Sequence, residues 1–187
     1  MKDYGELVVT AAKMSGDVEA ANFAGSLVAI AEQKLSRRLR ARQQQRIRTF
    51  KTDSNGSIPL PRDFIDLMHV YAGNVRLASV PYEMIKTSRR RGYSLVGDRL
   101  YSSEPSTELQ VGYFEEIPSL KAEGCNWLLE AAPDIYLQAL LHELAVKSLD
   151  IERATILLSY LDRLIADFMQ HNKSTLITAP AAGGPRP

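Results

Sequence analysis

The sequence predicts an α+β protein, mainly α-helical, in which a helical bundle carries an inserted antiparallel β subdomain and an extended C-terminal tail. Apolar residues recur with the helical period near both ends of the chain and alternate with polar residues in the middle, while the last residues are rich in Pro, Gly and Ala. We therefore expect one domain over residues 1–171, with helices in 1–44 and 126–171 and a β-rich insertion at 45–115. A flexible tail is expected at 172–187.

The most apolar stretch predicts two packed helices. Residues 135–149 carry apolar side chains around most of a helix circumference, which is typical of a helix buried between neighbours. Pro133 suits the first turn of this helix, where its missing N–H costs nothing, and Asn126 suits the N-cap of a short helix before it. After a turn near 148–151, a second, amphipathic helix follows. Its expected inward face is formed by Ala154, Leu157, Leu158, Leu161, Leu164, Ile165 and Phe168.

Two further helices are expected at the start of the chain. The first covers residues 4–14 and ends at a break over 15–17. Asn22 is the expected N-cap of the second, longer helix. The apolar positions of that helix are Phe23, Leu27, Ile30, Ala31, Leu35 and Leu39. Its last turns carry arginines, which interact favourably with the negative end of a helix dipole.

The periodicity changes from helical to alternating at Gln45. Residues 46–51 alternate polar and apolar, which predicts a half-buried strand. Asn55-Gly56 favours a tight hairpin, with 57–60 as the return strand. Further strands are expected at 67–71, 75–78, 93–96, 99–102 and 108–113, with a short helix at 81–87.

Composition limits the class of protein. The formal net charge is +1, so bulk charge indicates no partner, and the single cysteine, Cys125, excludes an intramolecular disulfide. The N-terminus lacks the basic-then-apolar pattern of a signal peptide, and no apolar run approaches the roughly 20 residues of a membrane span. We expect a soluble protein made in the cytoplasm, with no membrane partner.

Charge is distributed unevenly along the chain. Residues 34–91 contain 14 basic and 4 acidic side chains, whereas residues 104–167 contain 12 acidic and 4 basic ones. A chain with one basic and one acidic region can dock head-to-side with copies of itself, or present opposite signs to two partners.

No set of residues predicts catalysis. His142-Glu143 begins like a zinc-protease helix, but Val146 stands where the second histidine would be needed. Cys125 has no nearby histidine to act as its base, and we expect a buried structural thiol. A phosphate-binding loop is also lacking. The sequence predicts no enzyme, no cofactor and no metal site.

The arginine run over 37–48 is the one feature that points to a partner. It has two interpretations: a solvated helix end, or a surface for an anionic partner, either nucleic acid or an acidic protein. Aromatic side chains for base stacking are absent within the run. The candidate partner-binding arginines are Arg37, Arg38, Arg40 and Arg42.

Three landmarks carry a family resemblance. The first is an Asn-Trp-Leu-Leu, a Pro-Asp-Ile-Tyr-Leu and a Glu-Arg-Ala step, with motif residues Asn126, Trp127, Pro133, Asp134, Tyr136, Glu152, Arg153 and Ala154. The others are Leu-Pro-Arg-Asp-Phe at 60–64, and Leu-Gln-Val-Gly-Tyr at 109–113 followed by Ile-Pro-Ser-Leu at 117–120. In this order they resemble the head-to-tail adaptor (connector) proteins of tailed bacteriophages.

The resemblance implies a structural protein without catalysis or cofactor. Such proteins form a homo-oligomeric ring, usually of twelve copies, beneath the portal protein. The ring extends the channel for double-stranded DNA and receives tail or nozzle proteins, in the neck of a virion assembled in the host cytoplasm. Leu176, Ile177 and Pro180 are the implied anchors of the tail on the portal or a neighbouring subunit. Asn126, Trp127, Pro133, Asp134 and Tyr136 are expected to serve the core and helix capping. The alternative is a DNA-binding regulatory or packaging protein that uses Arg37–Arg48.

Overall fold

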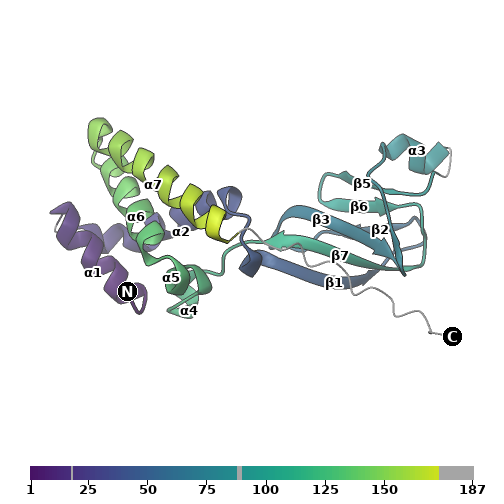
Figure 1. Cartoon of the computed structure of the whole chain (residues 1–187), viewed down its shortest axis with the longest axis horizontal. Helices are drawn as coiled ribbons and strands as arrows, with labels where there is room; N and C mark the ends of the chain where they lie inside the picture. The colour runs from purple at the N-terminus through teal and green to yellow at the C-terminus, as the bar shows by residue number, and fades with distance from the viewer. Residues whose placement is uncertain (18, 88–89, 173–187) are drawn as a thin grey trace. The chain divides into compact units, whose positions relative to one another are not determined.

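A computed structural model describes residues 1–17, 19–87 and 90–172 of the chain (Figure 1). Its seven α-helices and two antiparallel sheets confirm the α+β class. The chain forms two compact units. One contains Met1–Gln44 and the described residues from Glu116 onward, which we call the helical unit; the other contains Gln45–Glu115, which we call the β unit.

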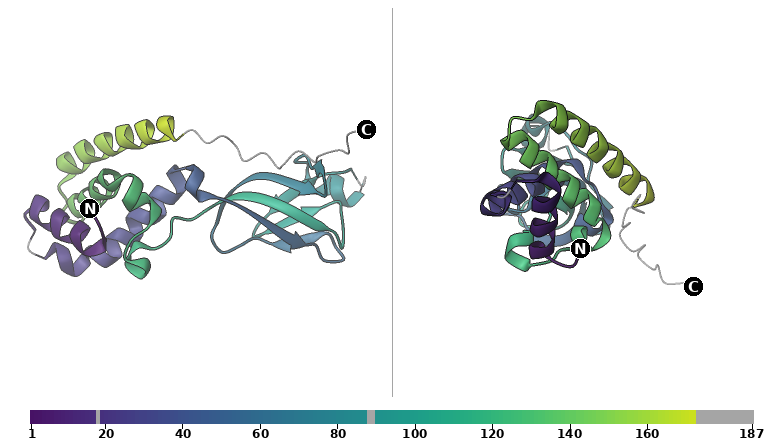
Figure 2. Two further views of the ribbon diagram at one scale, coloured as in Figure 1. Left: turned by 60° about the horizontal axis from the view of Figure 1, so that its bottom comes forward. Right: turned by 90° about the vertical axis from the view of Figure 1, so that its left-hand side faces the viewer.

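The helical unit is organised around one buried helix, α6. Its helices are α1 (Tyr4–Ser15), α2 (Ala20–Arg38), α4 (Leu120–Glu123), α5 (Trp127–Ala131), α6 (Pro133–Lys147) and α7 (Ile151–His171). Helix α6 packs against α1, α2, α5 and α7, and lies between α7 and the pair α1 and α2 (Figure 2). Nine of its 15 residues are buried, so the prediction of a helix enclosed by neighbours is confirmed.

Local sequence explains where the C-terminal helices start. The Asn126 side chain accepts a hydrogen bond from the Leu129 N–H and so caps α5, as predicted. Pro133 occupies the first turn of α6, also as predicted. Helix α7 begins after the 148–150 turn, and the Asp150 carboxylate accepts from the Arg153 N–H.

Some side chains of these helices differ from the expectation. Helix α2 starts at Ala20, so Asn22 is not its N-cap; instead the Asp17 carboxylate accepts from the Glu19 N–H just before the helix. Phe23 and Ile30 are exposed, because α2 turns a different face inward. That face is formed by Ala20, Ala24, Val28, Ala31 and Leu35, with Glu32 and Ser36. On α7, Leu158 lies at the edge of the buried face and stays exposed.

The β unit consists of two sheets and one short helix. The four-stranded sheet has the order β1 (Gln45–Lys51), β7 (Glu108–Glu115), β3 (Phe64–Ala72), β4 (Val75–Arg76). The three-stranded sheet has the order β2 (Ser57–Pro59), β6 (Arg99–Ser102), β5 (Tyr93–Val96), and α3 covers Tyr82–Thr87. One apolar cluster includes Ile58 and Leu100 from the second sheet and Val70, Val111 and Tyr113 from the first, so the two sheets share a core.

The predicted hairpin between β1 and β2 is wrong. A turn does form at Asn55-Gly56, with Gly56 at φ 75°, but β1 pairs with β7 and β2 pairs with β6. The chain therefore crosses from one sheet to the other at this turn. Ile58 is 2 % exposed opposite Leu100, so burial between the sheets decides the pairing.

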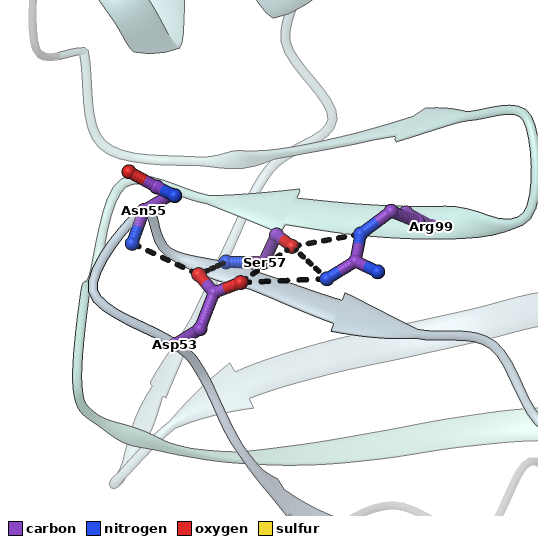
Figure 3. Close-up of polar contacts among 4 residues, drawn as sticks. All are labelled: Asp53, Asn55, Ser57 and Arg99. Carbon is purple, nitrogen blue, oxygen red and sulfur yellow. Dashed lines mark hydrogen bonds and ion pairs between the residues drawn. The ribbon is translucent and has the colours of Figure 1, made fainter.

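Asp53 holds this crossing together (Figure 3). Its Oδ1 accepts from the N–H groups of Asn55 and Ser57 at 2.9 and 2.8 Å, and its Oδ2 accepts from the Ser57 hydroxyl at 3.1 Å. The Arg99 guanidinium of β6 donates to the Ser57 hydroxyl and lies 3.3 Å from the Asp53 carboxylate. These bonds, the Ser57 N–H foremost, lower the pKa of Asp53.

Candidate functional site

The predicted arginine site lies at the C-terminal end of α2. The Arg37 Nε donates to the Gln33 carbonyl, and Arg38 forms an ion pair with Asp162 of α7. The Arg40 guanidinium donates to the carbonyls of Ser36, Arg37 and Leu39 at 2.7 to 3.3 Å. Arg42 is exposed on a 3-10 turn over Arg42–Gln44. Much of this positive charge therefore serves the helix end and its neighbour α7.

The remaining arginines of the run belong to the β unit. Arg46 and Arg48 lie on β1, where Arg46 is 2.5 Å from the Glu115 carboxylate and Arg48 is 3.6 Å from that of Asp63. Burial raises the pKa of Glu115 even though Arg46 opposes the shift. The run is thus divided between the two units.

Two arginines of the run keep their charge available. Within residues 1–17, 19–87 and 90–172, no carboxylate lies within ion-pair distance of Arg37 or Arg42. Both side chains are exposed. Of the four arginines predicted to bind a partner, these two are the ones that the described structure leaves without an acidic neighbour.

The motif residues Asn126 and Tyr136 meet inside the helical unit. Besides capping α5, the Asn126 side chain donates from Nδ2 to the Pro118 carbonyl at 2.6 Å and to the Tyr136 hydroxyl at 2.7 Å. Tyr136 is fully buried, and burial raises the pKa of its hydroxyl. The hydroxyl therefore remains a donor as well as an acceptor.

Glu32 of α2 completes this buried network. Its Oε1 accepts from the Tyr136 hydroxyl at 3.1 Å and from the Leu120 N–H at 2.7 Å. The residue is 7 % exposed, and burial raises the pKa of the carboxyl. One carboxylate thus links α2, α4 and α6. The role of Glu32 was not predicted from the sequence, although an acidic residue between Ala31 and Leu35 on the buried face of α2 was a visible signal.

The other motif residues have different surroundings. Trp127 is half-buried against the core of the helical unit, and its Nε1 has no hydrogen-bond partner among the described residues. Asp134 is exposed in the first turn of α6, where an acidic side chain suits the helix dipole. Leu176, Ile177 and Pro180 lie outside the described residues.

Ion pairs and hydrogen bonds tie α1 and α2 to the hairpin of α6 and α7. The Arg153 guanidinium donates to the carbonyls of Met14 and Ser15 at the end of α1. The Lys34 ammonium bonds both oxygens of the buried Glu143 carboxylate at 2.6 and 2.9 Å. His142 beside it is largely buried, and its Nδ1 lies 3.1 Å from Glu143. Sequence reasoning missed the role of Glu143, which depends on a lysine 109 residues away.

A metal site or a nucleophile–base pair would indicate chemistry in the described residues. No group of three or more His, Cys, Asp or Glu side chains there could hold a metal ion. An open groove of about 520 Å³ on the β unit is lined by residues that include Arg48, Phe50, Leu60 and Arg62. The residues that line this groove do not include a nucleophile next to a general base. Cys125 is half-buried against the core of the helical unit, so the thiol expected to be buried is buried only in part. Among the helices described, none is long and apolar enough to cross a membrane.

The comparison with known families gives the class of the protein. A family of bacteriophage head-to-tail adaptors matches the chain over residues 2–182, and such adaptors are structural components of the virion that associate with portal and tail proteins. The chain belongs to this family, the SU10 adaptor proteins, which are not known as enzymes. The resemblance found in the sequence is therefore confirmed. No curated protein is similar enough to the chain to count as a match.

Proposed function

We propose that the chain forms a homo-oligomeric ring between portal and tail, twelve copies by the family resemblance. The ring extends the DNA channel and serves as the platform for tail or nozzle proteins, and it assembles in the host cytoplasm. Membership of the SU10 adaptor family over residues 2–182 carries this proposal. The uneven distribution of acidic and basic residues along the chain supports it, because ring closure needs two different, complementary surfaces.

The C-terminal segment is proposed to anchor the ring. Leu176, Ile177 and Pro180 would dock on the portal protein or on a neighbouring subunit. Truncation after Asn172 is then expected to abolish attachment to the portal while the helical unit stays folded, measured by co-sedimentation and circular dichroism. Loss of helical signal on truncation would mean that the segment serves the fold instead.

Assembly with the portal protein tests the ring directly. The full chain is examined by sedimentation and negative-stain imaging, alone and with the portal protein of the same phage. We expect a ring bound to the portal. A chain that does not bind the portal protein under any condition would overturn the proposal.

DNA binding by Arg37–Arg48 is the alternative outcome. Phosphate contacts would give duplex affinity that falls steeply with salt. Because Arg38, Arg46 and Arg48 have acidic partners and Arg40 donates to backbone carbonyls, the ring proposal predicts only weak, non-specific duplex binding. A tight, salt-sensitive duplex complex in a gel-shift assay, without any portal complex, would favour the alternative.

A further inference from the structure

Exposed apolar side chains gather at one end of the helical unit. Leu149 and Ile151, in and just after the turn between α6 and α7, are 81 % and 67 % exposed. Met14, Phe23 and Val146 are exposed as well. We call these five residues the apolar end.

Contacts between the helices bring the segments that carry the apolar end close together. The Arg153 guanidinium, at the start of α7, bonds the Met14 carbonyl at the end of α1. The Lys147 ammonium, at the end of α6, lies 3.2 Å from the Asp17 carboxylate and 3.9 Å from the centre of the Phe23 ring. The end of α1, the start of α2 and the α6–α7 turn therefore meet here. Exposed apolar side chains that several elements bring to one place are typical of sites of protein association.

Leu149 has an unfavourable backbone conformation as well as an exposed side chain. Its φ is 57°, in the left-handed region where glycine is normally found after a helix. The turn closes with a bond from the Asp150 N–H to the Ala145 carbonyl. Glycine would fit this turn without steric cost, and a polar residue would suit water. Leu149 has neither the backbone freedom of glycine nor apolar contacts that bury its side chain within the subunit. Its presence is explained if the side chain packs against another molecule.

A second, different surface lies on the outward face of α2. Ile30 is exposed there, and Ser26, Gln33 and Arg37 follow the same helical stripe. Phe23 of this helix is at the apolar end, and Arg37 lies 14 residues further on, about 20 Å along the axis. The Ile30–Arg37 stripe therefore leads away from the apolar end.

The two surfaces carry complementary charges. Glu152, beside Ile151, is exposed and has no cation within ion-pair distance in the described part of the chain. Arg37 likewise has no carboxylate there, and it is too far along α2 to serve Glu152 of its own chain. A second copy can bring the two together while Leu149 and Ile151 cover Ile30.

We propose that the α6–α7 turn of one copy docks on the outward face of α2 in the next copy. Leu149 and Ile151 pack on Ile30, and Glu152 pairs with Arg37. Because the two surfaces differ, the contact is heterologous and can repeat around a closed ring. The inference rests on the proposed ring and names its subunit contact.

Charge reversal tests the pairing. Glu152→Arg or Arg37→Glu alone is expected to raise the concentration needed for half-assembly on the portal by about tenfold. The two changes in one chain should restore assembly, since each contact regains an opposite pair. Glu130→Arg, an equal reversal on an exposed part of α5, is the control and should have no effect. If the wild type forms no ring, the proposed function is wrong; if it forms rings and the reversals behave like the control, only this contact is wrong.

Two further variants keep folding and assembly apart. In Leu149→Gly the turn keeps its positive φ but loses the steric cost, so the variant should unfold at a higher urea concentration than wild type. It should nevertheless assemble more weakly, and unimpaired assembly would overturn the role of Leu149. In a Cys125→Ser background, Ile30→Cys together with Leu149→Cys should give, on oxidation in the ring, a ladder of covalent oligomers beyond the dimer. Dimers alone would indicate a two-fold contact, and uncrosslinked rings would indicate another surface; either result overturns the proposal.

Discussion

The buried Glu32 carboxylate is the most informative residue to change in the helical unit. Its Oε1 accepts hydrogen bonds from the Tyr136 hydroxyl and the Leu120 N–H, and the side chain is almost fully buried. Glu32→Ala leaves both donors without this acceptor. Glu32→Gln keeps an acceptor oxygen in place and removes the charge.

The structure sets the size of the effect. A buried donor that loses its partner costs about 1–3 kcal/mol. The bond between Tyr136 and Asn126 does not replace the lost one, because the Asn126 amide donates to the Tyr136 hydroxyl oxygen and leaves the hydroxyl hydrogen without an acceptor. With both the Tyr136 O–H and the Leu120 N–H losing their acceptor, Glu32→Ala should lower the free energy of unfolding of the helical unit by about 2–6 kcal/mol. Glu32→Gln should cost far less and, at neutral pH, can raise stability because it buries no charge.

The same carboxyl gives a pH dependence of known sign. Burial raises its pKa in the folded chain above the ordinary value of 4.5. The folded state therefore binds the proton more tightly than the unfolded state. The stability that this provides is complete below the unfolded pKa and is lost as the pH rises through the folded pKa. The free energy of unfolding of wild type minus that of Glu32→Gln should therefore fall as the pH rises from the unfolded to the folded pKa of Glu32. Above the folded pKa this difference should level off.

Tryptophan fluorescence provides the assay. Trp127 is the only tryptophan and packs against the core of the helical unit, so it reports that unit and not the β unit. Urea unfolding of wild type, Glu32→Ala and Glu32→Gln is followed at several pH values from about 4 to 8. A Glu32→Ala variant as stable as wild type, or a wild-type advantage over Glu32→Gln that grows with pH, would refute this reasoning.

Three further changes test other contacts. In Gly112→Ala the new Cβ would lie 2.4 Å from Nε2 of the buried His69 ring, so urea unfolding of the β unit, followed by circular dichroism, should show a loss of about 1–3 kcal/mol. Arg153→Ala removes the guanidinium bonds to the end of α1 and should cost about 1–2 kcal/mol by Trp127 fluorescence, whereas an unchanged midpoint would contradict that role. Because the pKa of Asp53 is lowered, its contribution is present above the ordinary carboxyl pKa and lost on acidification, so the advantage of wild type over Asp53→Asn in thermal unfolding should shrink below about pH 4.

The helices could be predicted because their signals are local. Asn126 and Pro133 mark helix starts by their own backbone chemistry, and the all-round apolar character of residues 135–149 indicates burial whatever the neighbours are. No local signal in the sequence indicates which face of α2 packs inward. Phe23 and Ile30 are as apolar as Val28 and Leu35, and only packing against α6 separates them.

The strands show the same limit. Alternation located β1 and the Asn-Gly pair located the turn at Asn55-Gly56, yet the partner of β1 is β7, about 60 residues later in the chain. Strand pairing is a choice among distant segments, and a turn signal informs only about adjacent ones. The shared core of the two sheets, with Ile58 between them, decided it.

By itself the sequence determined the α+β class, the starts of α5 and α6, the separation of charge and, through its spaced landmarks, membership of the adaptor family. These follow from composition, periodicity and short motifs, which do not depend on distant contacts. Only the tertiary structure decided that Glu32 joins Asn126 and Tyr136, and that Leu149 stays exposed. It also decided that Arg38, Arg46 and Arg48 have acidic partners, whereas Arg37 has none within the described residues. Each of these is a relation between residues far apart in the chain, and its physical basis, burial or pairing, exists only once the chain has folded.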